Sequence, residues 1–265
     1  MRAAIEKGDA KGLAELILQN PGFKFQDVSI IEGIKTLYFP SESGTLLHYA
    51  CRSSSRSAVI PLLLAHPGID VNAKNSGGAT PFDLACANGR TSCVREMLKD
   101  SRVKVNEPSN DGYTPLRRAA RNGHLDVIKW WIASGREIDL GKPEELRTDA
   151  IGVAKRYDKT EVVTLLERFK SDAVKTRSEV RLEIGWYNEA AAEMFAMVVF
   201  VSDGLLKTKA TGVKARAKRT RFFNIASQLP LELQMVLCYR VVQSAKEIIP
   251  GKDSEVAFKE LARRL

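Results

Sequence analysis

The stretch that decides the fold reads Gly112-Tyr113-Thr114-Pro115-Leu116-Arg117-Arg118-Ala119-Ala120-Arg121-Asn122-Gly123-His124-Leu125-Asp126-Val127-Ile128. Thr114 before Pro115 predicts a helix start, because the threonine hydroxyl can cap a free amide and proline lacks the N–H that would need a partner. Asn122-Gly123 predicts the end of that helix, and the apolar residues that follow predict a second one. Such a pair is too small to bury its apolar face alone, so we expect the unit to repeat.

The unit recurs at a regular spacing. Its threonine appears at Thr45, Thr80, Thr114 and Thr148, in steps of 35, 34 and 34 residues. The segments read Thr45-Leu46-Leu47-His48-Tyr49-Ala50-Cys51, Thr80-Pro81-Phe82-Asp83-Leu84-Ala85-Cys86, Thr114-Pro115-Leu116-Arg117-Arg118-Ala119-Ala120 and Thr148-Asp149-Ala150-Ile151-Gly152-Val153-Ala154. A period of this length indicates an array of stacked supersecondary units.

These segments closely resemble the ankyrin repeat, whose first helix opens T-P-L-H-x-A-A and whose period is about 33 residues. The resemblance implies an all-α solenoid of stacked helix pairs with short hairpin fingers over residues 1–170. Its repeats would lie near 1–36, 41–74, 75–108, 109–141 and 142–170. The first and last are degenerate, as solenoid ends require. Residues 1–25 are either an atypical cap or the remainder of a repeat within which the chain begins, and 26–43 predict an extended finger.

Beyond residue 171 the period disappears. We expect a helical extension at 171–206, a basic linker at 207–221 and a small α-helical segment at 222–265. Met194–Val201 is apolar all round, which predicts a helix buried on most sides. In the last helix we expect one apolar stripe, made of Val256, Phe258, Leu261 and Leu265.

The formal net charge of +9 is concentrated in one segment. Seven lysines and arginines between residues 207 and 221, with no acid among them, leave only about +2 for the rest of the chain. The segment admits three interpretations: a solvated linker, a nuclear-import peptide, or a binding site for RNA or anionic lipid. Its candidate residues are Lys214, Arg216, Lys218, Arg219 and Arg221. We do not expect nucleic acid to be the partner.

No catalytic constellation is present, so we expect a non-enzymatic protein without cofactor or metal. The resemblance places His48 and His124 at slots where the side chain bonds loop backbone, and His66 precedes Pro67 in a turn. Cys51 and Cys86 share a packing slot, which favours small buried hydrophobes over metal ligands. Trp130-Trp131 is either oversized core or a docking point for the C-terminal region.

The N-terminal sequence lacks the apolar segment of a secretory signal, and no apolar run reaches the ~20 residues of a membrane span. The cysteines form no Cys-x-x-Cys pair. We therefore expect an intracellular protein of the cytoplasm, the nucleus or both.

The resemblance implies a protein-interaction scaffold or adaptor that binds its partner through the concave face and fingers of the repeats, with contacts from the fingers and from the exposed ends of the first helices. The candidate residues are Asn110, Asp111, Tyr113, Arg117, Arg121, Asn122, Arg52, Asn88, Lys155 and Arg156. Arg117 replaces the usual histidine, and with the other basic residues it would form a positive stripe. We expect this stripe to prefer an acidic or acidic-aromatic peptide, with Tyr113 as an aromatic anchor.

A second hypothesis rests on the segment Leu229, Pro230, Leu231, Glu232 and Leu233. It is similar to the opening of F-box domains and of poxvirus-type ankyrin C-terminal domains, which bind Skp-type adaptors of ubiquitin ligases. The alternative function is thus a substrate-recognition adaptor. A proline at a helix start explains the same residues without any such partner.

Overall fold

The computed structural model describes residues 2–19, 44–66, 68–202, 226–242, 244 and 248–264. All regular structure within these ranges is helical, in agreement with the predicted all-α class. The chain divides into two compact units, one ending at Val180 and one beginning at Arg181. The predicted finger at 26–43, the basic linker at 207–221 and residues 222–225 lie outside the described residues.

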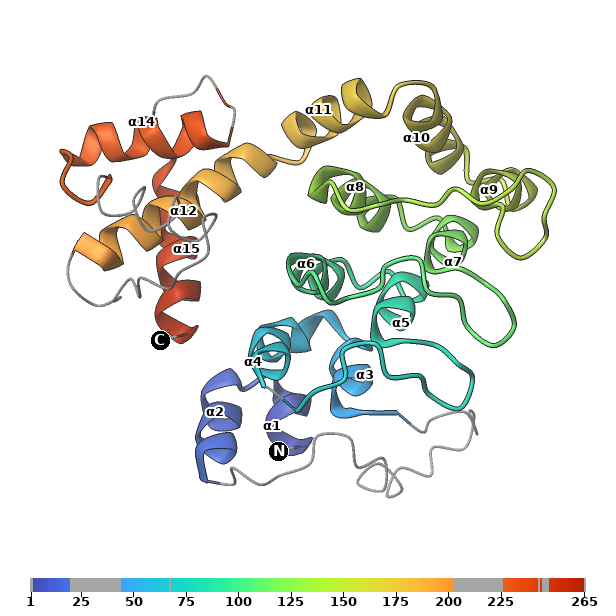
Figure 1. Cartoon of the computed structure of the whole chain (residues 1–265), viewed down its shortest axis with the longest axis horizontal. Coiled ribbons are helices and arrows are strands. Elements are labelled where there is room, and N and C mark those ends of the chain that lie inside the picture. The colour runs from blue at the N-terminus through green and yellow to red at the C-terminus, as the bar shows by residue number, and fades with distance from the viewer. Residues whose placement is uncertain are drawn as a thin grey trace, which may run out of the picture. The chain divides into compact units, whose positions relative to one another are not determined.

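The first unit is built from helix pairs. They are α1 (Arg2–Lys7) with α2 (Ala10–Gln19), α3 (Leu46–Ala50) with the 3₁₀ helix η2 (Ser54–Val59) and α4 (Ile60–Ala65), α5 (Pro81–Ala87) with α6 (Thr91–Lys99), α7 (Pro115–Asn122) with α8 (Leu125–Ser134), and α9 (Ala150–Arg156) with α10 (Thr160–Ser171). Figure 1 shows α3, α5, α7 and α9 stacked in one row, with α4, α6 and α8 in a second. The predicted solenoid of stacked pairs is confirmed.

The helix starts follow the predicted chemistry in the central repeats. The Thr80 hydroxyl accepts a hydrogen bond from the Asp83 amide at 3.2 Å, and the Thr114 hydroxyl accepts one from the Arg117 amide at 3.4 Å. Helix α7 ends at Gly123, whose φ of +75° is a left-handed conformation that glycine adopts without strain. The sequence therefore determines both ends of α7 locally.

The fifth repeat is one residue out of the predicted register. Asp149, and not Thr148, caps α9, because its carboxylate accepts a hydrogen bond from the Gly152 amide at 2.7 Å. The left-handed corner residue that follows is Asp158, with a φ of +55°. Asp158-Lys159 thus takes the place of Gly123-His124, one residue later than the spacing from Thr148 predicts. The step from the fourth repeat is 35 residues rather than 34.

Neighbouring fingers pack against one another. Each is a tight turn closed at its base by one backbone hydrogen bond, Asn75 N to Ala79 O at 3.0 Å and Ser109 N to Tyr113 O at 3.1 Å. Gly78 has a φ of +73°, and a Cβ there would lie 2.5 Å from the backbone nitrogen of Asn110. Only glycine fits at this contact, so the two fingers support each other.

The core runs between the two rows of helices. Trp131 is fully buried and meets the Phe82 ring edge-on, with 5.0 Å between centroids. Trp130 is half-buried, with the Arg95 guanidinium 3.9 Å from its ring centroid. Cys51 and Cys86 are fully buried and free, which confirms them as packing residues. Full burial of each large apolar side chain contributes about 1.5–3 kcal/mol, so this core is the main source of stability.

The first unit extends ten residues beyond the predicted boundary at 170/171. Helix α11 (Ala173–Glu183) buries Thr176 and Val180, and Arg177 Nε donates a hydrogen bond to Ile132 O at 3.1 Å. Arg168 and Glu179 form an ion pair between α10 and α11. The predicted single helix of the extension is broken at Gly185, whose φ is +70°.

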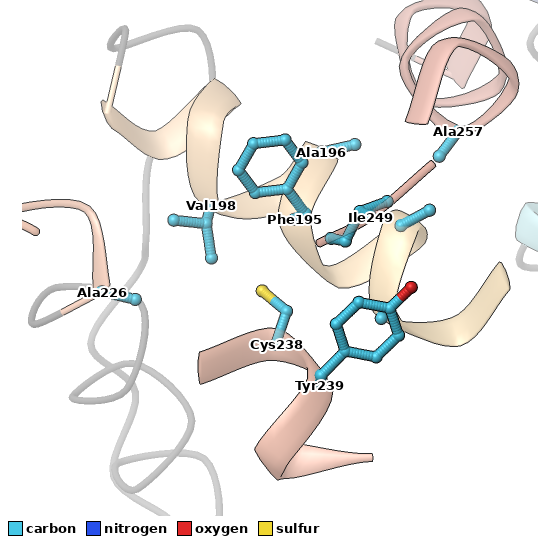
Figure 2. Close-up of a cluster of buried hydrophobic side chains, with 10 residues drawn as sticks. Phe195, Ala196, Val198, Ala226, Cys238, Tyr239, Ile249 and Ala257 are labelled. Carbon is cyan, nitrogen blue, oxygen red and sulfur yellow. The ribbon is translucent and has the colours of Figure 1, made fainter. Parts of the chain in front are cut away.

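The second unit is a small helical domain of α12 (Trp186–Ser202), α14 (Leu231–Val241) and α15 (Gly251–Arg264). Figure 2 shows the buried cluster that joins these helices, to which α12 contributes Phe195, Ala196 and Val198 and α14 contributes Cys238 and Tyr239, together with Ile249 and Ala257. The predicted burial of Met194–Val201 is confirmed for Phe195, Ala196 and Val198.

The predicted stripe of the last helix is correct in part. Phe258 and Leu261 pack against the core of the second unit, whereas Val256 is 56% exposed and Ala257 is buried in its place. Leu265 lies outside the described residues. Residues 256 and 257 are separated by about 100° around a helix, so only one of them can face the core.

Candidate partner-binding surface

The finger at residues 109–113 is held in place by hydrogen bonds and an ion pair from neighbouring side chains and from the preceding finger. Ser109 donates a hydrogen bond to Asp111, and the Arg118 guanidinium lies 2.7 Å from Ser109 Oγ and 3.1 Å from Asp111 Oδ2. Asn110 N donates to Gly77 O at 3.2 Å, which ties this finger to the preceding one. The finger is therefore ordered before any partner arrives.

Tyr113 stands at the base of this finger and is half-buried. Its ring lies under two cations, with the Arg117 guanidinium 4.0 Å and the Arg118 guanidinium 5.5 Å from its centroid. Contacts between a cation and a ring face contribute about 0.5–1 kcal/mol when exposed and more when desolvated. Tyr113 is thus held in one orientation, as a binding anchor needs.

Arg117 does not belong to an exposed positive stripe, contrary to our expectation. It is 5% exposed, and its Nε donates a hydrogen bond to Leu146 O of the next finger at 2.7 Å. Burial lowers the pKa of its guanidinium, although the nearby Tyr113 opposes this shift. Arg117 does what the histidine of this slot does in the second repeat, where His48 Nε2 lies 3.0 Å from Ala79 O.

The same slot in the third repeat holds a buried acid, which sequence reasoning missed. Asp83 is fully buried, and its Oδ1 lies 3.3 Å from Arg118 Nε. The pair is close enough for charge attraction, but neither carboxylate oxygen has a hydrogen-bond partner. Burial therefore dominates and raises the pKa of Asp83 to about 7, against the attraction of Arg118. The sequence did contain one signal of this burial, an acidic residue at the repeat position that usually holds histidine.

The residues predicted at the ends of the first helices are exposed. They are Arg52, Asn88, Arg121, Asn122, Lys155 and Arg156. Asn88 Nδ2 donates to Leu84 O at 2.8 Å, and Asn122 Nδ2 donates to Ala87 O at 2.8 Å, so both amides brace backbone. Lys155 pairs with Glu167 at 2.7 Å. The Arg121 guanidinium lies 4.9 Å from the centroid of the Tyr157 ring, an exposed aromatic that we had not included.

The segment of the F-box hypothesis lies at the start of α14. Leu231 and Leu233 are about half exposed, and the side-chain amide of Gln234 bonds Leu229 O at 2.8 Å. Pro230 is the residue before the first residue of the helix, where its missing N–H removes no hydrogen bond of the helix. The candidate residues Lys214, Arg216, Lys218, Arg219 and Arg221 lie outside the described residues.

The histidines take structural roles. His48 Nδ1 accepts a hydrogen bond from the Thr45 amide, so its Nε2 carries the proton that is donated to Ala79 O. Burial lowers the pKa of His48, although the hydrogen bond to Ala79 opposes this. His124 Nε2 lies 3.1 Å from Ala87 O, and His66 Nδ1 accepts from the Gly68 amide.

The described residues contain neither a candidate metal site nor a helix that could span a membrane. In that part of the chain, no three or more His, Cys, Asp or Glu residues are placed to hold a metal ion. Nor does any described helix have the length and apolar character needed to cross a membrane.

Comparison with known proteins agrees with the repeat architecture. The family model for ankyrin repeats (3 copies) matches residues 1–107 and 47–142, which together make up more than half of the chain. It does not extend to residues 229–233 and gives the adaptor alternative no support. Proteins named SMC5-SMC6 complex localization factor protein 1 align with the chain over 55 residues, with 47% identity in Bos taurus and Homo sapiens and 44% in Mus musculus. This stretch is 21% of the chain and 5% of each relative's length.

Proposed function

Because this chain belongs to the ankyrin-repeat family, we propose that it is a protein-binding scaffold whose partner docks on the fingers and on the exposed ends of α5, α7 and α9. Repeats of this kind present an extended surface, and function depends on what that surface displays. The proposed partner is a protein or peptide with acidic residues. The aligned stretch of 55 residues is 5% of the length of the localization factors. We therefore infer from this match only a protein-binding repeat module, and not that this chain binds the complex in their name.

The observation that carries the proposal is the preordered finger at 109–113. Tyr113 is fixed by Arg117 and Arg118, and the finger is bonded to the preceding one at Asn110. The next finger presents Leu146, 62% exposed, whose carbonyl accepts the hydrogen bond from Arg117. A surface that is already rigid loses little conformational entropy on binding, and aromatic anchors dominate interface energies.

We further propose an intracellular location, in the cytoplasm or the nucleus. Cys51, Cys86, Cys93 and Cys238 are all free and buried. Burial raises the pKa of Cys93 and of Cys238 to about 12, so these thiols stay protonated and serve as packing groups. Unpaired cysteines are typical of reducing compartments.

The test is affinity purification with the full chain as bait, comparing the wild type with a Tyr113→Ala, Leu146→Ala variant. The matched control is Val174→Ala, Leu182→Ala, which removes two exposed apolar side chains from α11. We expect a specific protein to be recovered with the wild type and the control and lost with the finger variant. Equal recovery with all three would contradict the proposal.

A further inference from the structure

The corrected register of the fifth repeat aligns three arginines at one structural position. Counting seven residues from the residue that caps each first helix, Thr45 leads to Arg52, Thr114 to Arg121 and Asp149 to Arg156. Under the uncorrected register the last position was Lys155, and no such row was visible. We call Arg52, Arg121 and Arg156 the arginine row. In the third repeat the same count from Thr80 reaches Ala87.

All three side chains of the row are exposed. The first helices α3, α5, α7 and α9 are consecutive in the stack, since α5 packs against α3 and α7, and α7 packs against α9 (Figure 1). The row therefore follows the stacking direction, with one gap at Ala87.

Hydrogen bonds between adjacent repeats hold the row in line. Arg90 Nε donates to Arg52 O at 2.9 Å. The carbonyl of Ala87 lies within hydrogen-bond distance of Asn122 Nδ2 and His124 Nε2, both from the following repeat. The helix ends of the second, third and fourth repeats are thus cross-braced from one repeat to the next, which fixes the spacing between Arg52 and Arg121.

Arg121 also has its direction set by a neighbour. Its guanidinium lies 4.9 Å from the centroid of Tyr157, which is 43% exposed. The planar guanidinium still has N–H donors at its edge for a carboxylate while its face rests on the ring. Acidic residues lie nearby as well: Asp158 is exposed and Glu167 pairs with Lys155. This mixture of acidic and basic side chains disfavours the binding of a continuous polyanion. It favours a ligand whose negative charges are spaced apart.

We propose that the arginine row binds an extended acidic peptide segment whose carboxylates recur every third residue. This proposal rests on the protein-binding function proposed above. Packed helices lie about 8–10 Å apart, and an extended chain advances about 3.3 Å per residue, so three residues span about one repeat. Each guanidinium can form a bidentate hydrogen bond with one carboxylate. The gap at Ala87 leaves one peptide position without a charged partner.

The experiment measures fluorescence anisotropy of a labelled ten-residue peptide with glutamate at positions 1, 4, 7 and 10, titrated with the full chain. A second peptide has the same composition with glutamate at positions 1, 3, 5 and 7. We expect tighter binding of the first peptide. Each of Arg52→Gln, Arg121→Gln and Arg156→Gln should weaken it about twofold to fivefold, the range of exposed ion pairs.

Ala87→Arg provides a gain-of-function arm. It completes the row, so we expect it to tighten binding of the first peptide by about twofold to fivefold. The side chain of Ala87 is partly exposed, and only its backbone carbonyl takes part in the cross-brace. The control replaces three exposed lysines outside the row by glutamine, Lys104, Lys170 and Lys175, and should leave binding unchanged.

The inference would be overturned by equal binding of the two peptides, by equal weakening of binding in the lysine control, or by displacement of the first peptide by a ten-nucleotide RNA at equal concentration. Absence of peptide binding would overturn it as well. Affinity purification separates this failure from failure of the proposed function. A partner lost with the finger variant but retained by a chain that carries Arg52→Gln, Arg121→Gln and Arg156→Gln together would refute the arginine row and leave the scaffold function standing.

Discussion

Replacing Asp83 by asparagine should make the stability of the first unit less sensitive to pH. Asp83 is fully buried on α5, with Arg118 of α7 and Asp111 of the finger as the charged groups that act on it. Burial raises its pKa from an ordinary value of 3.8 to about 7; Arg118 lowers it and Asp111 raises it. Between these two values the folded protein keeps a proton that the unfolded chain has released.

The sign follows from this difference in bound protons. A carboxyl whose pKa is raised on folding contributes full stability below about pH 4, and that contribution is lost as the pH rises through about 7. With 1.36 kcal/mol per pKa unit, the loss between pH 5 and pH 8 is roughly 2–3 kcal/mol for a shift from 3.8 to about 7. Asparagine has nearly the same shape and does not ionise.

The assay is urea unfolding at pH 5, 6, 7 and 8, followed by circular dichroism. We expect Asp83→Asn to gain roughly 2–3 kcal/mol relative to the wild type across this range. The control Asp126→Asn changes an exposed carboxylate on α8 and should run parallel to the wild type. The reasoning would be refuted if the free energy of unfolding of Asp83→Asn changed with pH in parallel with that of the wild type, or if the variant were less stable relative to the wild type at pH 8 than at pH 5.

Three further predictions concern the repeat scaffold and use the same unfolding measurement. Gly78→Ala should cost roughly 1–3 kcal/mol, because its φ is +73° and a Cβ would meet the backbone of the next finger; Gly77→Ala has space and should cost less, and equal costs would contradict this. Trp131→Ala should cost about 3–5 kcal/mol, since the side chain is fully buried; a cost below 1 kcal/mol would mean that it is not core. Asp149→Ala should cost about 1 kcal/mol and Thr148→Ala less, because Asp149 is the cap of α9, and the reverse order would restore the uncorrected register.

Local sequence was sufficient where a signal is complete within a few residues. Thr80 and Thr114 before proline, and Gly123 after Asn122, specify where helices begin and end, because capping and left-handed turns depend on neighbouring residues only. The same local rules led to the one-residue error in the fifth repeat. Thr148 and Asp149 are both good caps, and only the backbone of Gly152 shows which one is used.

The exposure of charged side chains could not be predicted from local sequence in the same way. Arg117 and Arg121 look alike in the sequence, yet one is 5% exposed and bonds the next finger, while the other is exposed and rests on Tyr157. The position of Asp83 in a histidine slot signalled its burial, but the sequence did not give the raised pKa, because that shift depends on how completely the carboxyl is desolvated. Burial of a charge depends on residues about one repeat away, which no local pattern contains.

The sequence by itself determined the repeat, its period and the all-helical class, because each helix start, stop and apolar slot is encoded within its own unit. The tertiary structure decided which of the displayed cations face solvent, where the last repeat falls in register, and hence that Arg52, Arg121 and Arg156 occupy one slot. The physical reason is that stacking buries one side of every repeat under the next. Whether a side chain binds the neighbouring repeat or remains free for a partner is therefore settled between repeats and not within them.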